Sequence, residues 1–470
     1  MSKFLKNTLI YSIAPYIPSL ANLLVLPIVT KDLTEFDYGI SGTVQAYISA
    51  FNALSVLGLS VILNNSFFHH SFHYKWIWRQ IYGFLALWNI IYAFIVTLFL
   101  FFFIPIEAQS NLGLIIFLNI FPIVFLGPSN YICNYYFLLN GNALPIGLRT
   151  AIFGIIAIVL NLLFISYFKL GYIGWFLSTC IVTSITNLSY WYTLRYKLKI
   201  KPILKLKKKT ILKSLKISLP LIPHQYSYYL LNGSERVIMN QLKIPINQIG
   251  LFNIASSFSN IASNLLQAIS NSLTPLIMNS LKQNDSKKVR KYLLTWLYST
   301  IILFALGSLW MKEIFYFLIN NEKLRDSYSI AIILIMSLSF TPLFLGYFSF
   351  LNFNSLTKSI WKTTFLAGVL TILLNLILIP IIGFIAVPIT IFFAFMYRGI
   401  SGYYLADYIK NKSVEYYPIL NSCLITAVTI LIYYLSNIEI IYKVIITLLI
   451  IITLFFNRVN LIHLKKSLIN

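Results

Sequence analysis

Long apolar stretches alternate with short polar segments along the whole chain. An apolar stretch of about 20 residues is long enough to cross a bilayer as a helix. The pattern predicts fourteen such helices, near residues 9–29, 38–63, 81–104, 112–139, 147–167, 172–195, 214–240, 248–280, 292–311, 328–351, 363–382, 384–408, 417–436 and 441–460. The predicted fold class is therefore an all-α polytopic membrane protein.

One predicted segment, 248–280, carries a polar stripe within its apolar bulk. The stripe recurs at steps of three and four, which places it on one helix face, and comprises Asn253, Ser256, Ser257, Asn260, Ser263, Asn264, Gln267 and Asn271. Unpaired amides facing lipid cost several kcal/mol each, so this face must contact protein or water. Hydrogen bonds between helices would explain one or two such residues. A stripe along the whole helix favours a polar cavity.

The composition agrees with a membrane protein and points to no cofactor. The chain has 470 residues, of which 59% are hydrophobic and 10% charged, with a mean hydropathy of +0.80. A soluble domain has about 25% charged residues. The sequence contains no dinucleotide-binding fingerprint, phosphate loop or paired-histidine motif, and its three cysteines form no metal or redox motif. We therefore expect neither a cofactor nor a metal site.

The net charge of +24 is distributed as in a membrane protein rather than a nucleic-acid-binding protein. If the N-terminus is inside, the only lysine and arginine residues in the external loops are Lys31, Lys169, Lys243, Lys312, Lys323, Arg325 and Lys443. This asymmetry predicts that both termini are cytoplasmic. The densest cluster follows the sixth segment and comprises Lys197, Lys199, Lys201, Lys205, Lys207, Lys208, Lys209, Lys213 and Lys216. We expect it to contact anionic membrane lipids.

The two halves of the chain repeat one plan. Residues 26–39 (LPIVTKDLTEFDYG) and 237–250 (VIMNQLKIPINQIG) each end a helix, form a short loop and place a glycine in the next helix. At this offset of 211, Gln45, Ser49 and Asn52 match Ser256, Asn260 and Ser263. Six segments separate the copies, which predicts two parallel six-helix lobes, as in transporters. The predicted domains are a first lobe at 1–196, a basic linker at 197–213, a second lobe at 214–412, and two extra helices with a tail at 413–470.

Several ionisable residues lie at membrane depth, where a charge is costly and commonly marks a pathway. Arg398 is about fourteen residues into its segment, or roughly 21 Å from its start. Guanidinium groups match phosphate geometry, and amides suit sugar hydroxyls. The candidate substrate-binding residues are Arg398, Arg236, Arg149, Asn253, Ser257, Asn260, Asn264, Gln267, Gln45 and Asn52, and the candidate coupling residues are Glu235, His224 and Asp407. Because adjacent helical residues do not face each other, Glu235 and Arg236 are expected to have separate partners.

Three stretches resemble Wzx-type polysaccharide flippases of the multidrug/oligosaccharidyl-lipid/polysaccharide exporter superfamily. They are LPIVTKDLTEFDYG at 26–39, ERVIMNQLKIPINQIGLFNIASS at 235–257, and LNLILIP-x2-G at 374–383. The resemblance implies that the protein moves an undecaprenyl-diphosphate-linked oligosaccharide across a bacterial plasma membrane, by two lobes that rock around a cationic cavity. Other polysaccharide-assembly proteins are implied partners. The first segment lacks the basic residues of peptidoglycan-precursor flippases, which argues against lipid II as the substrate.

Two alternatives stay open at this point. A cation-coupled drug exporter of the same fold would need carboxylates deep in the first lobe, where segments one to six have none at their centres. A polytopic glycan polymerase or glycosyltransferase would need a large external loop with catalytic groups, but the longest external loop is the short one around Lys312–Asp326. The prediction is therefore a transporter rather than an enzyme.

Overall fold

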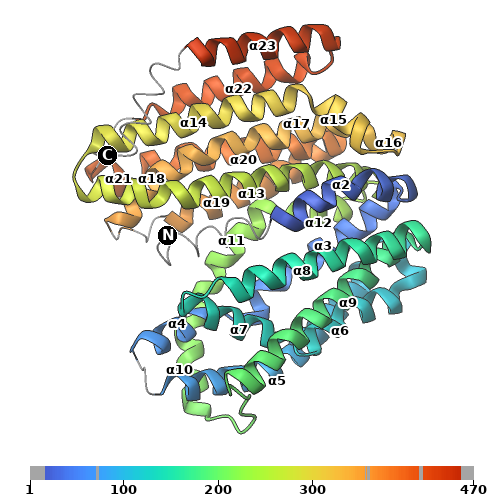
Figure 1. Ribbon diagram of the computed structural model, residues 1–470, viewed down its shortest axis with the longest axis vertical. Helices are drawn as coiled ribbons and strands as arrows, with labels where there is room; N and C mark the ends of the chain where they lie inside the picture. The colour runs from blue at the N-terminus through green and yellow to red at the C-terminus, as the bar shows by residue number, and fades with distance from the viewer. Residues whose placement is uncertain (1–15, 70–72, 355, 357–359, 412–415, 457–470) are drawn as a thin grey trace.

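The computed structural model describes residues 16–69, 73–354, 356, 360–411 and 416–456, and this part of the chain is helical without strands. The helices form two bundles, one above the other in Figure 1. The first bundle contains α2 (Tyr16–Asp32), α3 (Glu35–Val56), α4 (Ser60–His69), α5 (Tyr74–Phe103), α6 (Leu112–Val124), α7 (Gly127–Leu139), α8 (Leu144–Asn161) and α9 (Gly171–Tyr192). A basic connection containing α10 (Lys208–Ser218) leads to the second bundle.

The second bundle begins with α11, which runs from the first bundle into the second (Figure 1). It contains α11 (Ile222–Asn232), α12 (Ser234–Gln241), α13 (Ile246–Lys282), α14 (Ser286–Leu309), α15 (Met311–Leu318), α16 (Glu322–Arg325), α17 (Tyr328–Ser337), α18 (Thr341–Phe353), α19 (Ile360–Ile382), α20 (Ala386–Ser401) and α21 (Ala406–Asn411). Two further helices follow: α22 (Pro418–Leu435) packs against α14, and α23 (Ile440–Phe456) lies beyond α22 at the edge of this bundle.

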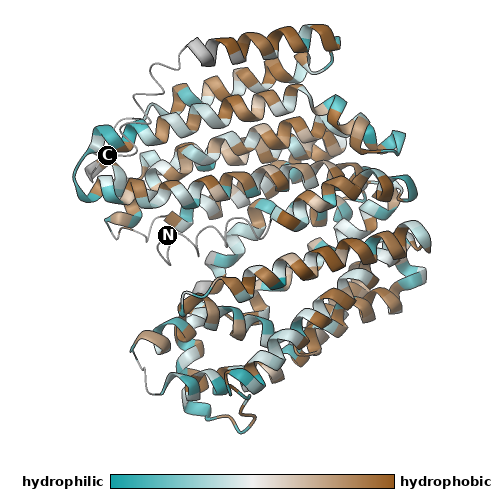
Figure 2. Cartoon of the chain, in the orientation of Figure 1, coloured by the Kyte–Doolittle hydropathy of each residue, from teal (hydrophilic) through white to brown (hydrophobic). Residues whose placement is uncertain are grey.

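Each of the fourteen predicted segments contains a helix, so the predicted fold class is confirmed. Eight helical stretches of the described chain are long and apolar enough to cross a membrane by themselves: 35–69, 74–103, 106–124, 144–167, 286–309, 322–353, 360–404 and 418–435. Hydrophobic residues predominate along these helices, which are largely brown in Figure 2, and many of these residues are exposed. Phe94, Phe102 and Ile381, for example, are each about two-thirds exposed. This is the surface expected of helices that contact lipid.

Helix capping and helix breaks determine where the helices of the first bundle begin and end. Thr34 and Asp37 form a capping box at the start of α3, which satisfies two free backbone N–H groups. The second carboxylate oxygen of Asp37 accepts a hydrogen bond from the Tyr172 backbone N–H at 2.8 Å, which ties the starts of α3 and α9 together. The helical conformation is interrupted between α6 and α7 at Leu126, whose φ is 56°. The break frees helix carbonyls, and Asn187 donates to those of Pro122 and Phe125 at 2.9 and 3.2 Å.

A buried ion pair joins the last helix to the second bundle. The Lys443 ammonium lies 2.6 Å from the Glu313 carboxylate and is fully buried. It also donates to the Ser436 carbonyl at 2.6 Å. Breaking a buried pair on one side leaves an uncompensated charge, which costs about 3–5 kcal/mol. The pair therefore fixes the position of α23 against α15.

The bundles touch along α3 and α13, where both helices begin. A β-carbon built on Gly39 would lie 2.1 Å from the Ile246 carbonyl oxygen, and one built on Gly250 would lie 1.8 Å from the Glu35 carbonyl oxygen. Only glycine permits two backbones to approach this closely. We call this contact the α3–α13 crossing. It closes the space between the bundles at this end.

Polar contacts from the segment around α16 surround the crossing. The Lys323 ammonium lies 3.2 Å from the Glu35 carboxylate. The Asn320 side chain donates to the Pro27 carbonyl at 2.7 Å, and the Asn321 side chain donates to the Leu33 carbonyl at 3.0 Å. All three contacts connect the second bundle to the α2–α3 turn of the first. They lie at the right-hand end of the molecule in Figure 1, where α16 is labelled.

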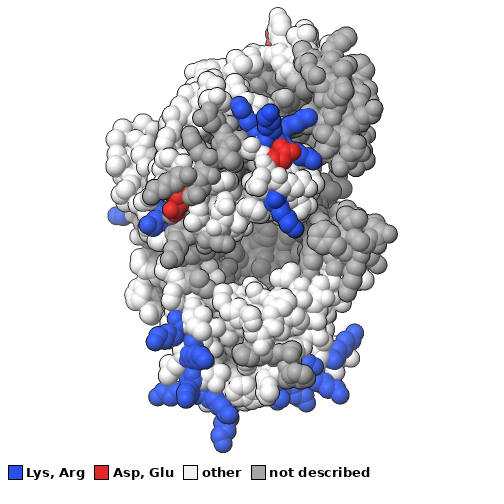
Figure 3. All heavy atoms as spheres, turned by 90° about the vertical axis from the view of Figure 1, so that its left-hand side faces the viewer, with Lys and Arg blue, Asp and Glu red and all other residues white. Residues whose placement is uncertain are grey.

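The opposite end of the molecule is basic. Figure 3 views this end and shows Lys and Arg side chains gathered on both bundles. The nine predicted lysines from Lys197 to Lys216 are all exposed. Their segment is held against α5, where the Arg79 side chain donates to the Lys201 carbonyl at 2.9 Å. The Lys207 backbone N–H donates to the Gln80 side chain at 2.9 Å. Backbone contacts therefore position the segment while its ammonium groups stay in solvent.

Candidate functional site

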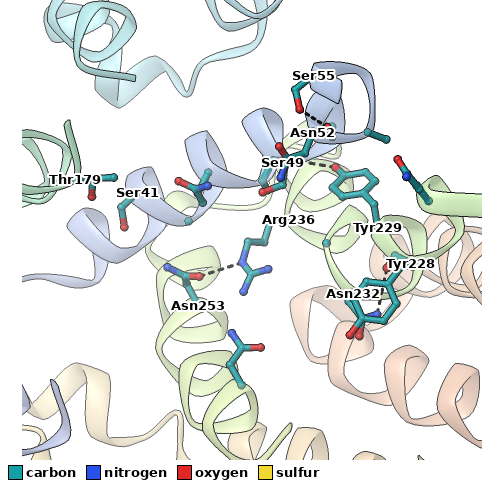
Figure 4. Close-up of a pocket in the computed structure, with 18 of the residues that line it drawn as sticks. Ser41, Ser49, Asn52, Ser55, Thr179, Tyr228, Tyr229, Asn232, Arg236 and Asn253 are labelled. Atoms are coloured by element: carbon teal, nitrogen blue, oxygen red, sulfur yellow. Dashed lines mark hydrogen bonds between the residues drawn. The ribbon is translucent and has the colours of Figure 1, made fainter. Parts of the chain in front are cut away.

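A polar cavity lies between the bundles, directly past the α3–α13 crossing. This central chamber has a volume of about 800 Å³ and is lined by α3, α11, α12 and α13 together with parts of α7 and α9. Its polar lining comprises Ser41, Gln45, Ser49, Asn52, Ser55, Tyr131, Thr179, Gln225, Tyr226, Tyr228, Tyr229, Asn232, Arg236, Asn253, Ser257 and Asn260. Figure 4 shows serines of α3 on one side and Tyr228, Tyr229 and Asn232 on another. Arg236 is the only charged residue among the described lining residues.

The Arg236 guanidinium is held in place by neighbouring polar groups. Its Nε donates to the Asn253 side-chain oxygen at 3.0 Å, a bond drawn in Figure 4. Another nitrogen donates to the Ser256 hydroxyl. The guanidinium also lies over the Phe252 ring, 5.2 Å from its centroid. Because Asn253 also donates to the Tyr38 carbonyl at 3.0 Å, this network connects α12, α13 and α3.

The expectation that Glu235 and Arg236 have separate partners is wrong. Their side chains form an ion pair with an Nη1–Oε1 distance of 3.1 Å. The two residues lie in the first turn of α12, directly after the break at Gly233, where no preceding helical turn constrains them. Glu235 is 3% exposed, so the pair neutralises a charge that would otherwise be buried alone. Arg236 therefore brings little net positive charge to the central chamber.

A second chamber of about 520 Å³ extends into the second bundle between α11, α13, α18, α19 and α20. This second-bundle chamber is lined by Gln225, Tyr228, Asn232, Ser263, Gln267, Ser270, Asn271, Thr274, Thr341, Thr364 and Arg398, together with apolar residues. Arg398 is 7% exposed. Its guanidinium lies over the rings of Phe344 and Phe395, at 4.2 and 5.1 Å from their centroids.

Arg398 differs from Arg236 in having no counter-charge. Within the described part of the chain, its guanidinium makes neither an ion pair nor a hydrogen bond, although its backbone carbonyl accepts from the Tyr347 hydroxyl at 2.8 Å. The aromatic faces supply about 2 kcal/mol of attraction when the cation is desolvated. This is small beside the cost of burying a cation. The arrangement therefore leaves five N–H donors available to an anion that enters this chamber.

A third chamber of about 490 Å³ extends into the first bundle between α3, α5, α6, α7 and α9. The polar residues of this first-bundle chamber are Gln45, Asn52, Ser55, Asn89, Tyr92, Asn119, Asn130, Tyr131, Asn134, Tyr135, Thr179, Thr183 and Asn187. None of the described residues that line it is acidic, basic or histidine. It is therefore polar but uncharged.

The three chambers form one cleft. Gln45, Asn52, Tyr131 and Thr179 line both the central and first-bundle chambers, while Gln225, Tyr228 and Asn232 line both the central and second-bundle chambers. Along α13 the lining runs from Asn253 to Thr274, or roughly 30 Å at the helical rise. Since α13 starts at the crossing and ends near the basic face, the cleft extends from the closed end towards the basic end.

The structure divides the predicted α13 stripe among several environments. Asn253, Ser257 and Asn260 line the central chamber, whereas Gln267 lines the second-bundle chamber and donates to the Asn271 side chain at 2.9 Å. Gln45 and Asn52 line the central chamber as well. Asn264 lines none of the three chambers, and its backbone carbonyl accepts a hydrogen bond from Tyr16 of α2. Residues spaced by three and four share one face of α13, and that face keeps a nearly constant direction. The cleft lies in different bundles at different heights, so a single face cannot line all of it.

The remaining predicted residues lie elsewhere. Arg149 is separate from the chambers and connects α8 to α9: it donates to Ser189 at 2.9 Å and to Thr193 at 2.7 Å, and it lies 4.6 Å from the Tyr190 ring centroid. Asp407 lies in α21, away from the three chambers. The side chain of His224 is outside the described part of the structure. Within the described chain, no three His, Cys, Asp or Glu residues are placed to hold a metal ion.

The sequence interpretation missed most of the first-bundle chamber. Asn89, Asn119, Asn130, Asn134 and Asn187 lie inside predicted spans that otherwise read as apolar. They do not form a stripe on any one helix, because four different helices contribute them. The available signal was the presence of amides at membrane depth, where each needs a partner.

The fold and the cleft define a class: multi-pass helical membrane proteins in which two bundles enclose a polar pathway. Within this class, residues 4–281 match the sequence profile described as polysaccharide biosynthesis protein. The chain belongs to this family. No curated protein matches the chain.

Solved structures share this fold. One is titled a lipid II flippase MurJ in an inward closed conformation, with a TM-score of 0.74 at 15% identity, covering 97% of this chain and 99% of that one. Another is titled an inward-facing conformation of a multidrug resistance MATE family transporter of the MOP superfamily, with a TM-score of 0.63 at 17% identity over 89% and 98%. A MOP superfamily transporter from Pyrococcus furiosus matches at 0.54 and 16% identity over 91% and 96%. The family match and the shared fold confirm the resemblance stated from the sequence.

Proposed function

We propose that this protein is a flippase for an undecaprenyl-diphosphate-linked oligosaccharide, which it moves from the cytoplasmic to the outer face of a bacterial plasma membrane. The cargo would be a repeat unit of O-antigen, capsule or a related polysaccharide. The observation that carries the proposal is the continuous cleft, which combines one uncompensated buried arginine, Arg398, with many amides and hydroxyls. A lipid-linked glycan presents the same combination, namely one anionic linker and many hydroxyl groups.

The family and the fold support this proposal over the two alternatives. The matched profile describes polysaccharide biosynthesis, which favours a glycan cargo. A cation-coupled drug exporter would need a carboxylate in the first bundle's pathway, and none of the described residues in the first-bundle chamber is acidic. A glycosyltransferase would need catalytic carboxylates in a cleft, whereas none of the described residues that line the three chambers is acidic.

The electrostatics suggest a driving force for this direction of transport. The membrane potential, negative inside, favours outward movement of an anion by about 2.3 kcal/mol per charge per 100 mV. Arg398 would hold the diphosphate while the bundles exchange a cleft open to the basic, cytoplasmic end for one open to the outer end. In this mechanism the α3–α13 crossing separates as the basic ends of the bundles close.

Reconstitution provides a direct test. We expect proteoliposomes containing the protein to translocate a fluorescent polyprenyl-diphosphate-linked oligosaccharide faster than protein-free vesicles, and faster still with a potential that is negative on the donor side. The measurement is the fraction of label accessible to a membrane-impermeant quencher over time. Translocation equal to that of protein-free vesicles would refute the flippase. Extrusion of an organic cation in the same vesicles would instead identify a drug exporter.

The orientation in the membrane gives a second prediction. Lys323, whose side chain is 77% exposed, lies near the α3–α13 crossing, and the exposed Lys208 lies at the basic end. After Cys133, Cys180 and Cys423 are replaced by Ser, we expect an impermeant thiol reagent applied to intact cells to label Lys323→Cys but not Lys208→Cys. Opening the cells should expose the second site. Labelling of both sites in intact cells would contradict cytoplasmic termini.

A further inference from the structure

The charges within the cleft are distributed unevenly. Two described cations line the cleft: Arg398 of the second-bundle chamber has no counter-charge, while Arg236 of the central chamber is paired with Glu235. The first-bundle chamber has no charged lining residue in the described chain. The two ends of the cleft therefore suit chemically different parts of one ligand.

The first-bundle chamber has amide groups that the protein itself leaves available. The side chains of Gln45 and Asn52 hydrogen-bond to no described residue. Asn119 donates to the Ile115 carbonyl at 2.8 Å and Asn187 donates to two carbonyls of the α6–α7 break, so in each the amide nitrogen is used. No described residue donates to their side-chain oxygens.

Other amides of the first-bundle chamber are held in fixed orientations by hydrogen bonds. Asn89 donates to the Ile123 carbonyl at 3.1 Å and is 7% exposed, so its orientation is set by the helix break. Asn134 donates to the Asn130 side-chain oxygen at 2.5 Å and accepts from the Tyr190 hydroxyl at 2.8 Å. These bonds therefore hold Asn89, Asn130 and Asn134 in place before any ligand arrives. Preorganised groups bind without paying the entropy of ordering.

We propose that the first-bundle chamber is a subsite for uncharged sugar residues, while Arg398 in the second-bundle chamber holds the diphosphate linker. Amide oxygens accept hydrogen bonds from sugar hydroxyls, amide nitrogens donate to them, and the rings of Tyr92, Tyr131 and Tyr135 offer faces to the C–H surface of a pyranose. This inference rests on the proposed function and adds the orientation of the cargo and its class of sugar.

The uncharged lining also excludes a class of cargo. A uronic acid or a sialic acid entering this chamber would lose water around its carboxylate and find no cation there. An unpaired charge in such a site is far more costly than a hydroxyl that finds amide partners. A neutral hexose or an N-acetylated sugar meets no such cost. The chamber therefore selects sugars without a carboxylate.

The test compares three probes in binding to the purified full-length protein: a short-chain polyprenyl diphosphate without sugar, the same carrier with a neutral trisaccharide, and the same carrier with one hexose replaced by a hexuronic acid. Trp175 lines the central chamber, so quenching of tryptophan fluorescence is a suitable readout. We expect the neutral glycan to bind at least about tenfold more tightly than the hexuronic acid form. Equal affinity for the two glycans would overturn the subsite.

Variants locate the preference in the chamber. Asn52→Leu combined with Asn119→Leu should weaken binding of the neutral glycan about tenfold, since each hydrogen bond is worth a factor of a few. Binding of the carrier without sugar should stay unchanged, and this result also shows that the variant is folded. Asn140→Leu is the matched control, because Asn140 is an exposed asparagine of the same bundle that lines none of the chambers. Unchanged glycan affinity in the double variant would contradict the assignment.

The outcome separates this inference from the proposed function. If the wild-type protein binds none of the three probes, the flippase proposal itself fails. If it binds all three with one affinity, the flippase stands and the sugar subsite is wrong. The wild-type comparison of the two glycans needs no variant, so it decides the inference even if the double variant does not fold.

Discussion

We expect replacement of Arg398 with Ala to abolish glycan export while protein level and membrane topology stay normal. Arg398 is the one described cation of the cleft without a counter-charge, and it is almost fully buried. A hydrogen bond between a charged donor and an anion contributes about 1.5–3 kcal/mol, and a guanidinium makes two of them to a phosphate. Loss of both contacts costs roughly 3 kcal/mol or more, which is at least a hundredfold in affinity.

Substitution with Lys distinguishes charge from geometry. Arg398→Lys keeps the positive charge but loses the planar fork that binds phosphate through two parallel bonds. We therefore expect activity between those of the wild type and Arg398→Ala. The measurements are the surface polysaccharide of cells and the affinity of the purified protein for a polyprenyl diphosphate without sugar.

Removal of a different arginine provides the control. Arg195 is exposed at the end of α9 and lines none of the chambers, so Arg195→Ala lowers the net charge by the same amount without changing the cleft. We expect it to export glycan normally. Normal export by Arg398→Ala would show that the diphosphate does not depend on this residue.

The sequence predicted the architecture well because segment length and internal repetition can be recognised without knowing which helices are neighbours. The length of the apolar stretches predicted the helices, and the offset of 211 between residues 26–39 and 237–250 predicted the two bundles. Arg398 was identified as a site candidate for the same reason, since a lone arginine at membrane depth is visible without coordinates. The contact of its guanidinium with the Phe344 ring could not be predicted, because Phe344 belongs to a different helix.

The functional site was predicted only in part because it depends on which helices become neighbours. Arg149 was a candidate because of its residue type, yet Ser189 of α9 and Thr193 directly after it supply hydrogen-bond partners outside the cleft. Asn264 shares the period of the stripe, but its side chain is exposed outside the three chambers and its backbone carbonyl accepts from Tyr16 of α2. Glu235 and Arg236 pair because a helix break at Gly233 precedes them, and periodicity rules assume a continuous helix. In each case a tertiary contact or a break overrides the pattern.

The α3–α13 crossing is formed by equivalent residues of the two sequence repeats, and it lies where the bundles separate in the proposed transport cycle. Gly39 and Gly250 are separated by the repeat offset of 211, and so are Glu35 and Ile246. In the structure Gly39 meets Ile246 while Gly250 meets Glu35, so each contact is the counterpart of the other. The crossing therefore lies on the pseudo-twofold axis that relates the bundles. Such a position allows the bundles to separate by a symmetric rocking motion.

A methyl group at either glycine should open the outer end of the cleft. In Gly250→Ala the new β-carbon would overlap the Glu35 carbonyl oxygen, a backbone atom that cannot move away alone. Overpacking of this kind costs about 1–3 kcal/mol. It acts only on the state in which the crossing is formed, so it shifts the population towards the outward-open state by roughly tenfold or more. Transport should fall, because the cycle needs both states.

Accessibility of the central chamber measures this shift. Ser257 lines the chamber one turn past Asn253, so Ser257→Cys in the cysteine-free background reports which end is open. We expect Gly250→Ala to raise its labelling by an impermeant thiol reagent from outside and to lower it from inside. Gly307→Ala is the matched control, because a β-carbon there would meet no atom within 4 Å. A Gly250→Ala protein that folds, transports at the normal rate and keeps its inside labelling would show that the crossing does not hold the bundles closed.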